Sequence, residues 1–167
     1  SQGCNSTTPL VTQSPHSGNQ SHTLQSKQRS LPVVASQGCD SATQLVSQSY
    51  DYGSQGRTHE EKLLLNNALQ SCPNHAEAHN NLGNAYLALE QFNQAVKCYQ
   101  QALTLKPDFI EAYNNLGKVF NDQEHYEQAV ETLQRALALN PNFAQAYNNL
   151  GNALSAQGKP ADAITAY

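Results

Sequence analysis

The sequence predicts an all-α protein, an α-solenoid of stacked antiparallel helix pairs preceded by a disordered tail. A phrase with two asparagines before Leu-Gly recurs as HNNLGN from His79, YNNLGK from Tyr113 and YNNLGN from Tyr147, always 34 residues apart. The segments between these phrases carry apolar residues at helical spacing. A fixed period of this length with helical patterning is typical of stacked helix pairs.

Residues 1–57 are rich in Ser and Gln, and their apolar residues follow no period. Such a segment cannot bury enough apolar surface to offset its chain entropy, so we predict a disordered low-complexity tail over 1–57. The tail contains a duplication, since SQGCNSTTPLVTQS at 1–14 resembles SQGCDSATQLVSQS at 36–49. The duplication indicates either an expanded linker or a repeated binding motif.

The repeat array is predicted to begin at Thr58, where the sequence THEE offers a capping box. A helical apolar face follows and predicts a helix at 58–71; its members are Leu63, Leu64, Leu65, Ala68 and Leu69. This helix forms a partial repeat, and gap-free alignment of the remaining chain gives three further units. The units are 58–72 (partial repeat), 73–106 (repeat 1), 107–140 (repeat 2) and 141–167 (truncated repeat 3).

Each full unit is predicted to contain a helix A, a tight turn and a helix B. The A helices are expected at 75–88, 109–122 and 143–156, and the B helices at 93–105, 127–139 and from 161 onward. Capping boxes are expected to begin the A helices, with Asn74, Asp108 and Asn142 as the caps. Gly158 suits the left-handed conformation that ends a helix.

The repeats resemble those of the tetratricopeptide repeat (TPR) family, whose pattern is a bulky residue, Leu-Gly, an aromatic, and later Ala, aromatic, Ala and Pro. The first copy supplies His79, Leu82, Gly83, Tyr86, Ala95, Tyr99, Ala102 and Pro107. The second supplies Tyr113, Leu116, Gly117, Phe120, Ala129, Leu133, Ala136 and Pro141. The resemblance covers 58–167. It implies that helices A and B cross closely at the glycines and that helix A lines the concave groove of a superhelix.

Polar residues occupy the face of each helix A opposite its Leu-Gly and aromatic positions. We predict that this face binds peptide; its residues are Asn80, Asn81, Asn84, Asn114, Asn115, Lys118, Asn148, Asn149 and Asn152. An Asn side chain offers an acceptor and two donors, which suits the backbone of an extended polypeptide. The alternative is that these asparagines bond neighbouring helices or are simply solvated.

The phrasing around the asparagines is similar to the repeats of protein O-linked N-acetylglucosamine transferases and related bacterial arrays. This similarity implies that the asparagine directly before Leu-Gly holds substrate polypeptide, which here means Asn81, Asn115 and Asn149. Chaperone-binding TPR domains instead use a carboxylate clamp of several basic residues. Lys118 is the one basic residue on this face, so the sequence does not favour such a clamp.

The sequence predicts no catalytic, cofactor or metal site in this segment. His75 and His79 have the spacing of helical metal ligands, but aromatic residues take both positions in the other copies, which indicates packing. The net charge of −4, with scattered Lys and Arg, argues against a nucleic-acid surface. No apolar run approaches the length of a membrane span.

The four cysteines, Cys4, Cys39, Cys72 and Cys98, form no CxxC pair. Four free thiols in a reducing compartment is the favoured interpretation, and it predicts a cytoplasmic location. A disulfide framework or a metal site is the alternative.

The leading functional hypothesis is a protein–protein interaction module that binds an extended polypeptide in its groove. One alternative is the substrate-recruiting arm of a larger glycosyltransferase or methyltransferase, with catalysis beyond residue 167. Another is a structural scaffold or spacer. The oligomeric state is left open by the sequence.

Overall fold

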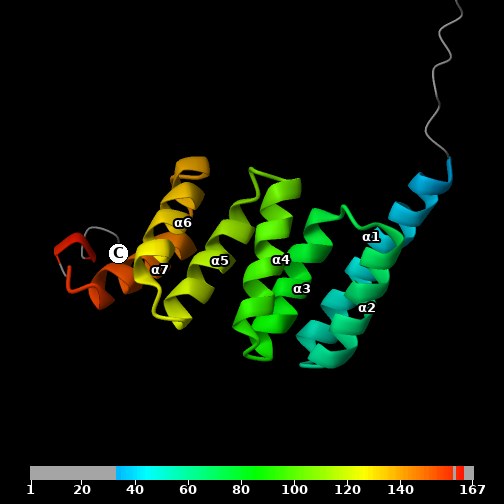
Figure 1. Ribbon diagram of the computed structural model, residues 1–167, viewed down its shortest axis with the longest axis horizontal. Helices are drawn as coiled ribbons and strands as arrows, with labels where there is room; N and C mark the ends of the chain where they lie inside the picture. The colour runs from blue at the N-terminus through cyan, green and yellow to red at the C-terminus, as the bar shows by residue number, and fades with distance from the viewer. Residues whose placement is uncertain (1–32, 160, 164–167) are drawn as a thin grey trace, which may run out of the picture. The chain divides into compact units, whose positions relative to one another are not determined.

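The computed structural model describes residues 33–159 and 161–163, with side chains from residue 39 onward. The described part is helical, and its helices are joined by short turns (Figure 1). In chain order they are α1 (Val33–Ser54), α2 (Thr58–Ser71), α3 (Ala76–Ala88), α4 (Phe92–Leu105), α5 (Ile110–Asp122), α6 (Tyr126–Leu139) and α7 (Ala144–Ala156).

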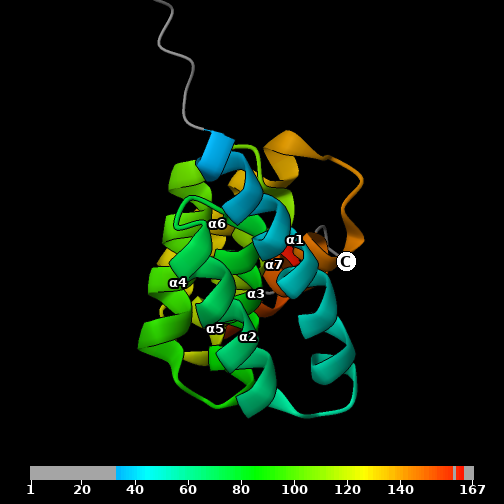
Figure 2. The same cartoon turned by 90° about the vertical axis from the view of Figure 1, so that its right-hand side faces the viewer.

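The helices pair in sequence order, α1 with α2, α3 with α4, and α5 with α6. Each second helix of a pair also contacts the first helix of the next pair, and α1, α3, α5 and α7 contact one another in turn. Figure 2 looks along this stack from the end formed by α1 and α2. The predicted α-solenoid of antiparallel helix pairs is therefore confirmed, with α3, α5 and α7 as its A helices.

The helix bounds follow the 34-residue period closely. The helix predicted at 58–71 is α2 itself, and the other predicted helices that are described differ from the structure by one residue at the N-terminal end. The third helix B, expected from 161 onward, is described only over 161–163, which are helical.

Helix α1 corrects the predicted extent of the tail, because residues 33–54 are helical rather than disordered. Its buried side chains are few and small: Ala42, Val46 and Ser49 form a narrow stripe at helical spacing, in the contact with α2 and α3. The buried Ser49 hydroxyl donates to the Val46 carbonyl at 2.7 Å, so its burial leaves no unmet donor. So narrow a stripe gives little apolar periodicity. The rest of the predicted tail, residues 1–32, lies outside the described residues.

The cysteines also differ from prediction, since Cys39 and Cys72 form a disulfide. Pairing of α1 with α2 brings their Cα atoms to 4.9 Å although the residues are 33 apart in sequence. Cys98 is a free thiol, and Cys4 lies outside the described residues. The interpretation of four free thiols is therefore wrong for Cys39 and Cys72. Across the described residues, no helix combines the length and apolarity that a membrane span requires.

The predicted capping boxes do not form. The A helices begin one residue later than expected, so their N-cap positions fall on His75, Phe109 and Phe143. His75 is the exception that still caps with a side chain, because its Nδ1 accepts from the Ala78 N–H at 3.3 Å. Thr58 is likewise the first residue of α2 rather than its cap.

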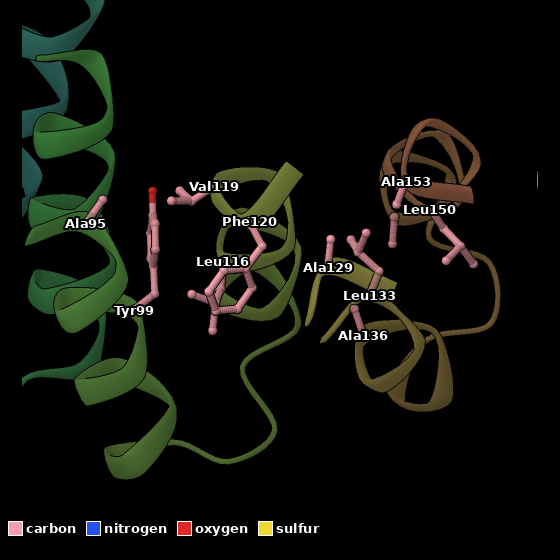
Figure 3. Close-up of a cluster of buried hydrophobic side chains, with 11 residues drawn as sticks. Ala95, Tyr99, Leu116, Val119, Phe120, Ala129, Leu133, Ala136, Leu150 and Ala153 are labelled. Carbon is pink, nitrogen blue, oxygen red and sulfur yellow. The ribbon is translucent and has the colours of Figure 1, made fainter. Parts of the chain in front are cut away.

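The core runs along the array between successive helices. Figure 3 shows part of it, where side chains from α4, α5, α6 and α7 meet. Buried members include Ala95 and Tyr99 of α4, Leu116, Val119 and Phe120 of α5, Ala129, Leu133 and Ala136 of α6, and Leu150 and Ala153 of α7. Since each helix pair contacts only the adjacent pairs, every pair needs the next one to cover its apolar face.

Gly83 and Gly117 lie where the two helices of a pair approach most closely. A Cβ atom at Gly83 would sit 2.6 Å from Cε1 of Tyr99, and one at Gly117 would sit 2.5 Å from Cγ of Leu133. Real Cβ atoms do not come this near to another heavy atom. The predicted role of the recurrent glycine at the helix crossing is therefore confirmed.

We expect Gly117→Ala to lower the free energy of unfolding by about 1–3 kcal/mol, because overpacking forces helix α5 away from Leu133. Urea unfolding measures the change. The same substitution in a Leu133→Ala background is the control, since the smaller side chain leaves room for the added methyl. Equal destabilisation in both backgrounds would show that the contact with Leu133 is not the cause.

The turns within the pairs place one residue in the left-handed region. Gly158 has φ 74°, as predicted, and the equivalent positions in the first two copies are Glu90 at 55° and Glu124 at 61°. A side chain with a Cβ pays a steric cost in this conformation that glycine avoids.

Glu124→Gly should raise the free energy of unfolding by about 0.5–1 kcal/mol, the relief of steric strain less the added entropy of an unfolded glycine. The control is Gln134→Gly, an exposed position in the middle of α6, where glycine should destabilise by about 1 kcal/mol. Thermal unfolding distinguishes the two. A loss of stability in both variants would contradict the strain argument.

Candidate functional site

The recurrent asparagines lie on the row of helices α3, α5 and α7, but not all of them face solvent. Asn84, Lys118, Asn148 and Asn152 are exposed, and Asn115 and Asn149 are partly buried. The remaining three are buried, although they lie on the face predicted to bind peptide: Asn80 is 6% exposed, Asn81 3% and Asn114 7%.

Side-chain amides of five of the asparagines join successive A helices. Asn115 Nδ2 of α5 donates to Asn80 Oδ1 of α3 at 3.2 Å and to Asn84 Oδ1 at 3.1 Å. Asn149 Nδ2 of α7 donates to Asn114 Oδ1 of α5 at 2.9 Å. We call this series the asparagine ladder. It bears out the alternative raised by the sequence, that these residues bond neighbouring helices.

The ladder is anchored to the core by Tyr99. The ring of Tyr99 is fully buried against Gly83, and its hydroxyl donates to Asn84 Oδ1 at 2.8 Å. Burial, together with the neighbouring Cys98, raises the pKa of Tyr99 well above its usual value, so the hydroxyl stays protonated as a donor. Asn84 therefore accepts from both the core and the next A helix.

The ladder stops at Asn81. Its Oδ1 accepts from Asn80 Nδ2 at 3.3 Å, but its own Nδ2 is buried and has no hydrogen-bond partner among the described residues. Asn115 and Asn149 donate to residues 35 positions earlier, and Asn115 also to one 31 positions earlier. For Asn81 the same offsets reach Val46 and Tyr50 of α1, neither of which is an asparagine.

Two hollows lie along this row of helices. One, of about 300 Å³, lies between α5 and α7 and is lined by Asn114, Asn115, Lys118, Gln145, Asn148 and Asn149. The other, of about 400 Å³, lies between α1, α2 and α3 and is lined by Tyr50, Gly53, Ser54, Thr58, Glu61, Asn81, Asn84 and Ala88. We call these the Lys118 hollow and the Glu61 hollow.

Glu61 projects from α2 toward Gly53 of α1, so close that a Cβ at Gly53 would lie 2.9 Å from Glu61 Oε2. Burial raises the pKa of Glu61 above its usual value. The carboxylate has no hydrogen-bond or ion-pair partner among the described residues. The neighbouring Arg57 pairs with Glu60 at 3.1 Å and lies over the Tyr52 ring.

Sequence reasoning missed Glu61 and the contribution of α1 to the site. Asn81 and Asn84 of the Glu61 hollow were predicted. Apart from Ala88 of α3, its other residues lie on α1 and α2, outside the three aligned copies. A signal existed in the 34-residue offset, which places Tyr50 of α1 in register with Asn84. The same offset puts Gln48 and Ser49 where the other copies have Leu-Gly, so this stretch was assigned to the tail rather than to a regular repeat.

The other polar candidates do not form a chemical site in the described part. His79 Nε2 lies 2.9 Å from the Pro73 carbonyl oxygen, and no group of three potential metal ligands occurs among these residues. Burial raises the pKa of the Cys98 thiol to about 11, which disfavours the thiolate that a nucleophile needs.

Comparison with known proteins identifies the repeats. Residues 83–123 and 117–158 match the family described as TPR repeat, and residues 64–97 match the one described as Tetratricopeptide repeat. These matches together span more than half of the sequence, and the chain belongs to the tetratricopeptide repeat family. Repeats of this family mediate contacts between proteins, and the fold is generally non-catalytic. No curated protein matches the sequence.

Solved structures share the fold. A crystal structure of MamA superposes with a TM-score of 0.70 at 23% identity, over 75% of this chain and 73% of that one. A structure from the functional characterization of Pseudomonas aeruginosa pilF gives 0.71 at 26% identity, over 79% and 59%. The first TPR of Spaghetti (RPAP3), bound to the HSP90 peptide SRMEEVD, gives 0.68 at 25% identity, over 70% and 93%.

We expect Glu61→Gln to raise the melting temperature slightly at pH 7, by about 1–2 °C. The folded state holds the Glu61 proton more tightly than the unfolded chain does, so stability is lost as pH rises through the raised pKa. The difference in melting temperature between variant and wild type should therefore vanish below about pH 4, where Glu61 is protonated in both the folded and the unfolded chain. Differential scanning calorimetry across pH 3–8 measures it, with Glu124→Gln as the exposed control. A difference that persists at low pH would point to a contact of Glu61 other than its charge.

Proposed function

We propose that the face formed by α3, α5 and α7 binds an extended polypeptide segment of a partner protein. The observation that carries the proposal is the pair of hollows along the asparagine ladder, both lined by side-chain amides at the surface of the array. An amide side chain can donate and accept at once, as a peptide backbone does. Such a face suits a backbone whatever its side chains.

The asparagines divide between two roles in this proposal. Asn80 and Asn114 are buried and set the spacing of the A helices through the ladder. Asn81 is also buried, but it makes no bond to another A helix and its Nδ2 has no partner among the described residues. The exposed members Asn84, Lys118 and Asn148 are the ones that contact peptide directly. We include in this proposal the similarity to O-linked N-acetylglucosamine transferase repeats. Of the three positions that this similarity singles out, Asn81 is buried and Asn115 and Asn149 are partly buried.

The charge of the face favours a different ligand from that of the RPAP3 repeat. That protein is bound to the HSP90 peptide SRMEEVD, which is acidic toward its end. Here the Lys, Arg, Asp and Glu side chains lining the two hollows are Lys118 in one and Glu61 in the other, so several acidic residues would meet little complementary charge.

Two other hypotheses were raised by the sequence, an arm of a larger enzyme and a structural scaffold or spacer. The matched families and structures concern the repeats and lend no support to an arm of a glycosyltransferase or methyltransferase. A scaffold or spacer would need no binding along the A helices, so a direct binding test separates it from the proposal.

The test is selection of 12-residue peptides from a random phage-displayed library on the wild-type protein, followed by fluorescence anisotropy. Lys118→Trp fills the Lys118 hollow and should weaken the selected peptides at least tenfold. The matched control is Lys97→Trp, an exposed position on α4 outside both hollows, which should leave affinity unchanged. Peptides that bind the two variants equally, or a library that yields no binders, would contradict the proposed function.

A further inference from the structure

The Glu61 hollow differs from the Lys118 hollow in having two unmet polar groups. The amide nitrogen of Asn81 is buried without an acceptor, and the carboxylate of Glu61 is partly buried without a cation. Buried polar groups in folded proteins nearly always have partners, so two such groups at one hollow point to a ligand that supplies them.

We propose that the Glu61 hollow recognises a basic residue, Arg or Lys, of the bound polypeptide. The cationic side chain pairs with Glu61, and a main-chain carbonyl of the same segment accepts from Asn81 Nδ2. This inference rests on the proposed function, because it names the side chain that one end of the groove selects.

Among the described residues, no group accepts a hydrogen bond from Asn81 Nδ2. At the steps from α7 to α5 and from α5 to α3, the donor finds an asparagine oxygen on the preceding A helix. At the step from α3 to α1, the equivalent position is Val46, whose side chain has no oxygen. A peptide carbonyl is the group that would continue the series, since it matches the amide oxygen used at the other steps.

The cation for Glu61 is also missing from the array. Arg57 is bound to Glu60 and stacked on Tyr52, while Lys62 lies over the Tyr86 ring at 5.4 Å. A carboxylate that has lost part of its water gains most from a fixed positive charge with hydrogen-bond donors, which guanidinium and ammonium groups provide.

Other ligand classes fit the hollow less well. An anion would be repelled by Glu61, and a neutral ligand would leave that carboxylate unpaired. A divalent metal needs several oxygen ligands, yet no cluster of three acidic, His or Cys side chains exists in the described part of the chain. The hollow of about 400 Å³ has room for a long basic side chain lying along α3.

The experiment compares two fluorescein-labelled nonapeptides of alternating Ser and Ala, one with a central Arg and one with citrulline, its neutral near-isostere. At 50 mM salt the wild-type protein should bind the Arg peptide about tenfold more tightly. Glu61→Gln should remove this preference. The control Glu111→Gln removes an exposed carboxylate from α5 and should leave the preference for the Arg peptide intact. The preference should shrink at 500 mM salt because ions screen the pair.

Nuclear magnetic resonance tests the second contact without a substitution in the ladder. The side-chain amide resonances of Asn81 should shift when either nonapeptide is added, and those of Asn67, exposed on α2, should not. Equal affinity for the two nonapeptides, or a preference that survives Glu61→Gln, would overturn the inference. It would leave the proposed function standing if the library peptides still respond to Lys118→Trp. If the library peptides also bind Lys118→Trp as tightly as the wild-type protein, both the inference and the proposed function are contradicted.

Discussion

The packing of Tyr99 against Gly83 is the contact on which the arrangement of the polar face depends. The glycine allows α4 to approach α3 until the ring of Tyr99 lies on the backbone, and this approach carries the hydroxyl to Asn84. Asn84 then accepts from Asn115 of the next A helix. A steric property of the core therefore fixes where the amides of two neighbouring helices meet.

Much of the fold was predictable because three aligned copies of the repeat carry the same pattern of residues. Leu116 and Gly117 recur at one register with Leu82 and Gly83, so helix bounds and crossings follow from alignment alone. Helix α1 was not predictable in this way. It buries small residues in a narrow stripe, and Ser49 stands where the other copies have glycine, so neither composition nor pattern marks it as helical.

The site was predictable as a face but not residue by residue. The helical wheel separates polar from apolar positions, yet Asn80 and Asn114 lie at its border, where the neighbouring A helix covers them. Asn148 occupies the same register and is exposed, because no described helix A follows α7. The disulfide between Cys39 and Cys72 was equally hidden, since it depends on a helix pair that the predicted tail excluded. Both the burial of these asparagines and the disulfide depend on contacts between helices that are far apart in the sequence.

The Cys39–Cys72 bond has a mechanical consequence. Units that contact only their neighbours detach one helix at a time when a load pulls on the end of an array. Here α1 is tied covalently to the residue that follows α2, so the two helices cannot be peeled apart in succession. Under tension they would leave α3 as one block, and the wall of the Glu61 hollow would be lost in a single step rather than gradually.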